Sequence, residues 1–175
     1  RSDNAVTFVD NHDTQPGQAL YSFVQGWFKP LAYACILFRK DGLPCVFYGD
    51  YYGLPSHNIL PMPDLKKMIK IRELYAYGMQ TDYFDHENII GWVRMGDDAH
   101  QDSGMAVVLS DGAGGIKRMF MGTKYVGTQF RDVTGKCPET VVVKEDGWGE
   151  FRVEGGSVST WVSRGAYEFL ETEMA

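Results

Sequence analysis

The chain has 175 residues, of which 44% are hydrophobic and 23% charged, a composition typical of one globular unit or two small ones. The 17 Lys and Arg residues against 23 Asp and Glu give a formal net charge of -6, which excludes a broad phosphate-binding surface. We therefore expect no nucleic-acid partner. No stretch approaches the roughly 18 consecutive apolar residues of a membrane span, so no membrane partner is expected either.

The first residue and the cysteines bear on the context of the chain. It begins with Arg1 rather than Met, which favours a fragment of a longer protein. Cys35, Cys45 and Cys137 have no Cys-x-x-Cys spacing, which predicts buried free thiols rather than disulfides or a zinc site. Free thiols favour a cytoplasmic location over a secreted one, although any signal peptide would precede Arg1.

Strands and helices are expected to alternate in the first half of the chain. An apolar strand at 5–10 ends in polar residues, and a buried helix at 30–39 starts with Pro30. A second strand at 44–48 and an amphipathic helix at 64–77, closed by a glycine, follow. The order strand, helix, strand, helix predicts parallel strands covered by helices.

Short apolar or alternating runs separated by Gly and Asp fill the second half, and they predict antiparallel strands in a Greek-key β-sandwich. These runs are 82–85, 89–94, 105–110, 117–121, 129–132, 140–143, 150–153 and 157–162. The fold class is thus α/β plus all-β. We expect one domain at 1–79, a second at 80–165, and a frayed or weakly helical tail at 166–175.

Several prominent side chains have structural explanations. Trp92, Trp148 and Trp161 could form a saccharide platform, but strand alternation favours core positions for them. The lysines of the second helix are expected on a solvated face, and three histidines on the surface. The lysines are Lys66, Lys67 and Lys70, and the histidines are His57, His86 and His100.

The densest group of polar side chains follows the first strand, in the sequence Phe8-Val-Asp-Asn-His-Asp13. In parallel α/β architectures, ligands bind at this end of the strands. Three chemistries fit the residue types: a metal centre, a general acid/base pair of His12 with Asp13, or a carboxylate that stabilises an oxocarbenium-like transition state. A purely structural turn is the fourth alternative.

The chain resembles the C-terminal part of a bacterial liquefying-type alpha-amylase, a retaining glycoside hydrolase, over nearly all its length up to about Arg164. The resemblance rests on ordered segments rather than on one motif. They are Phe8 to Gln18, Trp27 to Tyr33, Gly42 to Asp50, Gly147 to Phe151 and Gly155 to Ser159. It implies strands seven and eight of a (β/α)8 barrel in 1–79, followed by the C-terminal β-sandwich of the family.

The resemblance also implies roles for individual residues. Asp13 takes the place of the third catalytic carboxylate, and His12 that of the histidine that contacts sugar hydroxyls at the cleavage site. Asn11 and Gln15 are implied to bind substrate. Together they would stabilise the cationic transition state more than the ground state.

The nucleophile and the proton donor of the family lie on earlier strands, and no residue here matches them. Retaining hydrolysis needs both carboxylates, about 5 to 5.5 Å apart, so the chain alone is expected to be inactive. The full-length protein is expected to hydrolyse internal α-1,4-glucosidic bonds of starch, glycogen or maltodextrins with retention. Its expected partners are the α-glucan and the N-terminal remainder of the barrel.

Calcium is the one cofactor that the resemblance implies, bound mostly by residues outside this chain. The matching sandwich positions are Asp111 and Asn88, where an amide replaces the carboxylate of the family and weakens the site. A turn-forming role for both residues is the alternative.

Two other functions stay open. One is a non-catalytic glycan-binding or interaction module built on the β-sandwich. The other is a metal-dependent phosphoesterase fragment, which would need a second cluster of Asp and His ligands that the sequence does not display.

Overall fold

The computed structural model describes residues 2–174, so Arg1 and Ala175, the outer ends of the predicted segments 1–79 and 166–175, lie outside the described residues. The first half contains η1 (Ser2–Asn4), β1 (Val6–Thr7), α1 (Lys29–Phe38), β2 (Leu43–Pro44), α2 (Tyr48–Tyr52), η2 (Pro55–His57) and α3 (Leu65–Tyr75). The second half contains β3 (Gln80–Tyr83), β4 (Ile89–Arg94), β5 (Met105–Ser110), β6 (Gly115–Phe120), η3 (Thr123–Tyr125), β7 (Gln129–Asp132), β8 (Thr140–Val142), β9 (Trp148–Val153), β10 (Ser157–Ser163) and α4 (Arg164–Met174). Within residues 2–174, every helix is too short or too polar to cross a bilayer.

The N-terminal half contains two short parallel strands, β1 and β2. Val6 pairs with Leu43 and Thr7 with Pro44, and α1 forms the crossover between the strands, as the sequence predicts. Both strands are much shorter than the predictions of 5–10 and 44–48, and Tyr48 starts α2 instead of ending a strand. Within residues 2–174 each of these strands has a hydrogen-bonded neighbour on one side only, so the chain is not held extended beyond the paired residues.

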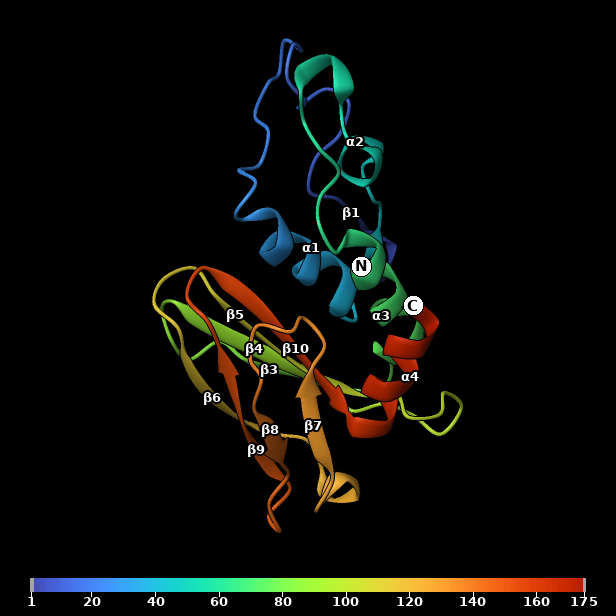
Figure 1. Ribbon diagram of the computed structural model, residues 1–175, viewed down its shortest axis with the longest axis vertical. Coiled ribbons are helices and arrows are strands. Elements are labelled where there is room, and N and C mark those ends of the chain that lie inside the picture. Colours follow the sequence, from blue (N-terminus) through green and yellow to red (C-terminus); the bar gives the residue numbers. More distant parts are fainter. Residues whose placement is uncertain (1, 175) are drawn as a thin grey trace.

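The helices α1 and α3 form a layer on one face of the larger sheet (Figure 1). In α3 the buried side chains recur at spacings of three and four, which confirms the predicted amphipathic pattern. The helix ends at Tyr75, two residues before its predicted end. Gly78 follows with a φ of +77°, and a Cβ at this position would lie 2.1 Å from the carbonyl oxygen of Gly96, so only glycine fits there.

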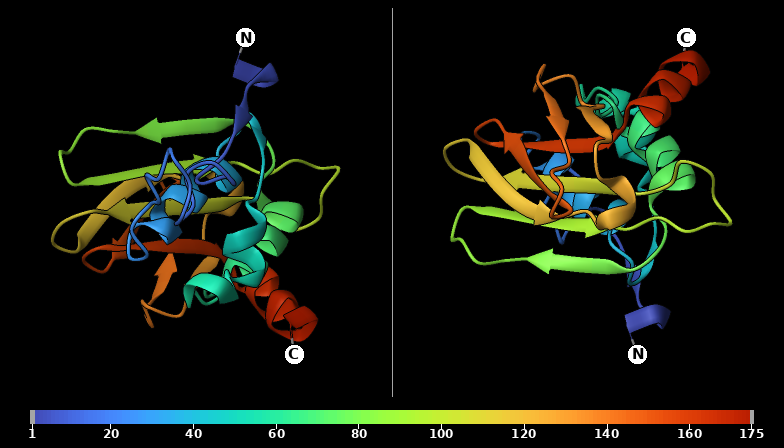
Figure 2. Two further views of the ribbon diagram at one scale, coloured as in Figure 1. Left: turned by 90° about the horizontal axis from the view of Figure 1, so that it is seen from above. Right: turned by 90° about the horizontal axis from the view of Figure 1, so that it is seen from below.

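The second half of the chain forms antiparallel sheets. The larger sheet has six strands in the order β3-β4-β5-β10-β7-β8, and β6 with β9 forms a separate two-stranded sheet. Each of the predicted runs overlaps a strand, and β4, β5 and β7 have the predicted bounds. Figure 2 shows the N-terminal loops over one side of this sheet-rich part.

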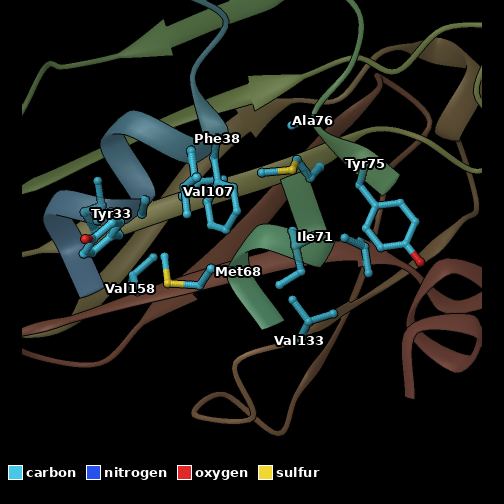
Figure 3. Close-up of a cluster of buried hydrophobic side chains, with 14 of the residues drawn as sticks. Tyr33, Phe38, Met68, Ile71, Tyr75, Ala76, Val107, Val133 and Val158 are labelled. Atoms are coloured by element: carbon cyan, nitrogen blue, oxygen red, sulfur yellow. The ribbon is translucent and has the colours of Figure 1, made fainter. Parts of the chain in front are cut away.

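Strand β10 contributes to two hydrophobic cores because its side chains alternate between the faces of the sheet. Val158 and Val162 join Phe38 of α1 and Met68 of α3 in a core between the helices and the large sheet, the helix–sheet core (Figure 3). Trp161 points to the opposite face and belongs to the core between the two sheets, the sheet–sheet core. The large sheet is therefore covered on both faces.

The tryptophans of the strands follow the predicted core assignment in two of three cases. Trp92 and Trp161 are fully buried, at 0% exposure each. Trp148 is only half-buried, where its ring packs on Phe120 and lies 4.6 Å from the guanidinium carbon of Arg118. It sits at the start of β9, in a sheet of two strands that does not enclose it.

The C-terminal tail forms a helix, α4, which is one of the two predicted alternatives, but it packs against the protein where no packing pattern was expected. Ala166 and Leu170, four residues apart, are buried on one side of α4. The hydroxyl of Tyr75 donates a hydrogen bond to the carbonyl oxygen of Ala166 at 2.7 Å. Of the α3 lysines predicted on a solvated face, Lys66 is exposed. Lys67 and Lys70 instead pair with this helix, Lys67 with Glu171 at 2.9 Å and Lys70 with Glu173 at 3.6 Å.

The cysteines are all free, and they differ in burial. Cys137 is buried, and burial raises the pKa of its thiol to about 11, so it is unreactive as a nucleophile near neutral pH. Cys35 is half-buried, and Cys45 is exposed, which contradicts the prediction of a buried thiol. Cys45 directly follows β2, where no further strand of residues 2–174 covers the pair.

Candidate functional site

The segment from Asp10 to Gln15, named here the 10–15 turn, follows the carboxyl end of β1. The side-chain oxygen of Asn11 accepts hydrogen bonds from the backbone N–H groups of Asp13 at 2.9 Å and Thr14 at 3.1 Å. This is the geometry of an Asx turn, in which an Asn side chain replaces a backbone acceptor. Asn11 thus orders the turn, and its contact with a substrate stays a prediction.

His12 and Asp13 project from this turn into solvent. Their side chains are 84% and 57% exposed, and the His12 Nε2 atom lies 3.5 Å from the Asp13 Oδ1 atom. A side-chain contact this exposed adds little to stability, so it does not explain the arrangement. The structure brings the two predicted catalytic residues together and leaves both accessible to a ligand.

The loops that follow β1 and β2 lie next to each other. Gly17 has a φ of +84°, and a Cβ at this position would lie 3.0 Å from the Nε2 atom of His57, the last residue of η2. Gln15 is half-buried in the same region, and its carbonyl oxygen accepts a hydrogen bond from the N–H of Gln18 at 3.3 Å. The carboxyl edge of the parallel pair therefore carries one continuous group of loops, with the predicted site residues His12, Asp13 and Gln15 on it.

Asp10 points the other way, into the protein. It is 2% exposed, its carboxylate lies 2.9 Å from the Lys29 Nζ atom, and it accepts a hydrogen bond from the backbone N–H of Val24 at 3.2 Å. Lys29 also binds the carboxylate of Asp50, whose other oxygen accepts a hydrogen bond from the Tyr33 hydroxyl at 2.6 Å. We name these four buried residues, Asp10, Lys29, Tyr33 and Asp50, the Lys29 cluster.

The electrostatics of the Lys29 cluster follow from its burial. Removing an ion from water costs several kcal/mol, and the two carboxylates offset this cost for the ammonium group. The Lys29 Nζ atom also lies 3.3 Å from the centroid of the Phe23 ring. Burial, followed by the hydrogen bond to the Asp50 carboxylate, raises the pKa of Tyr33 far above its ordinary value, so this hydroxyl remains a donor.

No local sequence pattern points to the Lys29 cluster. Its partners are separated by 19 residues (Asp10 and Lys29) and 21 residues (Lys29 and Asp50), so no local spacing reveals them. One signal was present. Lys29 is the first residue of an apolar helix, where the positive end of the helix dipole disfavours a cation unless carboxylates lie nearby.

A metal centre built from the 10–15 turn does not form in the structure. Asp10 is engaged with Lys29, whereas His12 and Asp13 are exposed on the other side of the turn. In the part of the chain that is described, no three or more His, Cys, Asp and Glu side chains group so as to hold a metal ion. The phosphoesterase alternative therefore gains no support.

The predicted calcium residues Asn88 and Asp111 do lie together. The N–H of Asp111 donates to the carbonyl oxygen of Asn88 at 3.3 Å, and both line a cavity of about 120 Å³ between α1 and the sheet. Glu87 is the third oxygen-bearing side chain there, and the remaining lining is apolar apart from Cys35. Calcium takes 6–8 oxygen ligands, so these residues do not by themselves fit the ion.

Large hydrophobic side chains are exposed in the N-terminal half, including one on each strand of the parallel pair. Those with at least half of their surface exposed between residues 2 and 60 are Val6, Phe8, Leu20, Tyr21, Trp27, Leu43, Tyr48, Tyr52 and Leu60. Scattered exposed apolar residues are normal, whereas exposed apolar residues on directly paired strands are a feature of surfaces that associate. Val6 and Leu43 are direct pairing partners, at 62% and 59% exposure.

The sequence of the chain is similar to those of known proteins. The family described as alpha-amylase C-terminal matches residues 105–162. The chain is 56% identical to a glucan 1,4-alpha-maltohexaosidase of Bacillus sp. (strain 707) over 92% of its own length and 31% of that protein. It is also 56% identical to an alpha-amylase of Bacillus licheniformis, over 91% of its own length and 32% of that protein.

A solved structure agrees in fold. The alpha-amylase from Geobacillus thermoleovorans, complexed with acarbose, superimposes with a TM-score of 0.58 at 17% identity, over 92% of this chain and 39% of that one. The chain spans about a third of the length of the Bacillus relatives. By sequence, the chain belongs with the bacterial alpha-amylases and corresponds to their C-terminal part.

Proposed function

We propose that this chain acts as part of an endo-acting alpha-amylase that hydrolyses internal α-1,4-glucosidic bonds of starch, glycogen or maltodextrins with retention. The observation that carries this proposal is the exposed Asp13, presented beside His12 at the carboxyl edge of a parallel strand pair. The names of the 56% identical relatives, an alpha-amylase and a maltohexaosidase, support the α-glucan substrate.

The architecture that we propose has two domains. Residues 1–79 would contribute the seventh and eighth strands of a (β/α)8 barrel, and residues 80–165 a Greek-key β-sandwich. The parallel pair with its α1 crossover and the exposed Val6 and Leu43 support the first assignment, because barrel strands have neighbours on both sides. The N-terminal remainder of the barrel is then the partner that covers the exposed strands.

Within this proposal Asp13 stabilises the positive charge that develops on the sugar ring, and His12 donates a hydrogen bond to a ring hydroxyl. A carboxylate stabilises an oxocarbenium-like transition state more than a neutral ground state, so it lowers the barrier rather than merely binding substrate. Asn11 holds the backbone of Asp13 by the hydrogen bond described above. Gln15 is proposed to contact a neighbouring sugar.

The nucleophile and the proton donor have to come from the N-terminal remainder, since retaining hydrolysis needs two carboxylates about 5 to 5.5 Å apart flanking the bond. We propose that the chain alone is inactive. Asp111 and Asn88 could contribute to a calcium ion only together with oxygen ligands from outside this chain, and no step of the reaction depends on them here.

The test is a chimera in which residues 1–175 replace the corresponding C-terminal part of the Bacillus licheniformis alpha-amylase. We expect the chimera to hydrolyse soluble starch and release α-anomeric products, measured by reducing ends and by NMR of the fresh products. Asp13→Asn is expected to lower kcat by at least about 10²- to 10³-fold, the cost of removing one electrostatic stabiliser.

The matched control is Asp98→Asn, an exposed carboxylate on the loop between β4 and β5. It is expected to keep the activity of the parent chimera. Near-normal kcat in a folded Asp13→Asn chimera would refute the role of Asp13. Retention of the isolated chain on insoluble starch, with no activity in any folded chimera, would favour a non-catalytic glycan-binding module instead.

A further inference from the structure

The exposed Asp13 is connected to the buried Lys29 cluster by a continuous chain of hydrogen bonds. The Thr14 hydroxyl donates to the carboxylate of Asp10 at 3.1 Å and accepts from the backbone N–H of Asn11 at 3.1 Å. The side chain of Asn11 then accepts from the backbone N–H of Asp13 at 2.9 Å. The Asp13 side chain is therefore 57% exposed to solvent, while hydrogen bonds that start at the buried cluster hold its backbone in place.

The Lys29 cluster joins three segments that are distant in sequence. Asp10 comes from the turn after β1, Lys29 and Tyr33 from α1, and Asp50 from α2, which follows β2. Of these, α1 is the most firmly held, because its later residues Leu37 and Phe38 are buried in the helix–sheet core. Through Lys29, the turn that carries Asp13 is anchored to that core.

The placement of charge in the cluster is not explained by helix stability. Lys29 lies in the first turn of α1, where a positive charge is unfavourable beside the positive end of the helix dipole. Its burial adds the cost of removing the ammonium group from water. A buried ion pair stabilises a fold no better than apolar residues of the same shape would. The ion pair instead fixes the orientation of the Asp10 carboxylate, whose oxygens face both Lys29 and Thr14.

We propose that Thr14, Asp10 and Lys29 are positioning residues for Asp13. They set the height and angle of its carboxylate above the strand edge, so that it meets the developing charge on the sugar. The proposal rests on the proposed function of Asp13. Catalytic geometry is sensitive to this kind of support, because a displacement of about 1 Å can lower a rate by about 10²-fold.

Thr14→Val is the variant that tests the link, because it keeps the shape of the side chain and removes the hydroxyl. In the chimera described above we expect kcat to fall about 10- to 100-fold while KM changes by less than about threefold, because the sugar-binding groups remain in place. Thr14→Ser, which restores the hydroxyl, is expected to return kcat to within about threefold of the parent.

The chain offers a closely matched control. Thr134, after β7, donates its hydroxyl to the carboxylate of Asp132 at 2.6 Å, far from the 10–15 turn in sequence. Thr134→Val removes an equivalent hydrogen bond, so it is expected to change stability but not kcat. A structural role for Thr14 would make the two valine variants behave alike.

A second readout does not depend on activity. In the 175-residue chain itself, Thr14→Val is expected to speed hydrogen exchange at the amides of Asn11, Asp13 and Val24 relative to Thr134→Val. Unchanged exchange, a kcat within twofold of the parent, or no recovery in Thr14→Ser would each overturn the proposal. Loss of activity in Asp13→Asn together with normal turnover in Thr14→Val would reject the positioning role alone, whereas normal turnover in Asp13→Asn would reject the proposed function itself.

Discussion

The two halves of the chain differ in the kinds of side chain that they bury and expose. The C-terminal half encloses three aromatic side chains between two sheets, Phe130, Phe151 and Trp161, each at 0% exposure. The N-terminal half buries four members of a charged cluster and leaves large hydrophobic side chains such as Val6 and Leu43 exposed. The N-terminal half therefore pairs its buried ions and exposes apolar strand residues, whereas the C-terminal half buries apolar side chains between its sheets and against the N-terminal helices.

The largest expected loss of stability comes from the C-terminal half. Trp161→Ala removes a fully buried ring and its hydrogen bond to the carbonyl oxygen of Arg152 at 3.2 Å. We expect the free energy of unfolding in urea to fall by about 3–5 kcal/mol. Trp27→Ala, at a ring that is 53% exposed, is the control and should change it by less than about 0.5 kcal/mol. A similar loss of unfolding free energy in both variants would contradict the proposed difference in burial between the two halves.

In the N-terminal half the corresponding change is Lys29→Met. It leaves the carboxylates of Asp10 and Asp50 buried without their cation, which we expect to cost about 3–5 kcal/mol at pH 7. The triple variant with Asp10→Asn and Asp50→Asn removes the uncompensated charge. It should recover much of the loss in the same urea measurement, and a triple variant as unstable as Lys29→Met would show that charge is not the cause.

A smaller effect is expected where α4 joins the halves. Leu170 is at 0% exposure and belongs to the helix–sheet core, so Leu170→Ala should lower the free energy of unfolding by about 2–3 kcal/mol. Phe169→Ala, the neighbouring position at 52% exposure, is the matched control. Equal stability of the two variants would mean that α4 does not contribute to the core.

The smallest effect concerns pH. The hydrogen bond from Lys117, at 2.6 Å, holds the pKa of the Asp85 carboxyl below its ordinary value. A carboxyl with a lowered pKa in the folded state adds stability above its unfolded pKa of about 3.9, and this is lost as the pH falls through the folded value. The Tm difference between the parent and Asp85→Asn should therefore be small near pH 6 and vanish in acid. A difference that grows below pH 4 would contradict this assignment, and Asp98→Asn is the exposed control.

Sequence patterns predicted those parts of the fold in which local periodicity and long-range packing agree. The bounds of β4, β5 and β7, and the buried stripe of α3, follow from periodicity alone. The lengths of β1 and β2 did not follow, because strand length depends on neighbouring strands as well as on composition. The packing of α4 did not follow from the sequence, because only Ala166 and Leu170 of this helix are buried.

The candidate site was predictable in part for a similar reason. His12 and Asp13 lie within one motif, so their proximity at the end of a strand could be anticipated. The Lys29 cluster could not, since its members come from three elements and meet only after the chain has folded. The sequence therefore predicted the exposed residues His12 and Asp13 of the candidate site, but not the buried Lys29 cluster beneath them.

Strand β10 has a consequence for the engineering of this protein by recombination. This strand contributes to both cores, because Val158 and Val162 lie on one of its faces and Trp161 on the other. A gene crossover placed between the helical layer and the β-sandwich would set side chains from two parents against each other along the whole strand. Exchanging the helices, both sheets and α4 together keeps every one of these contacts within one parental sequence.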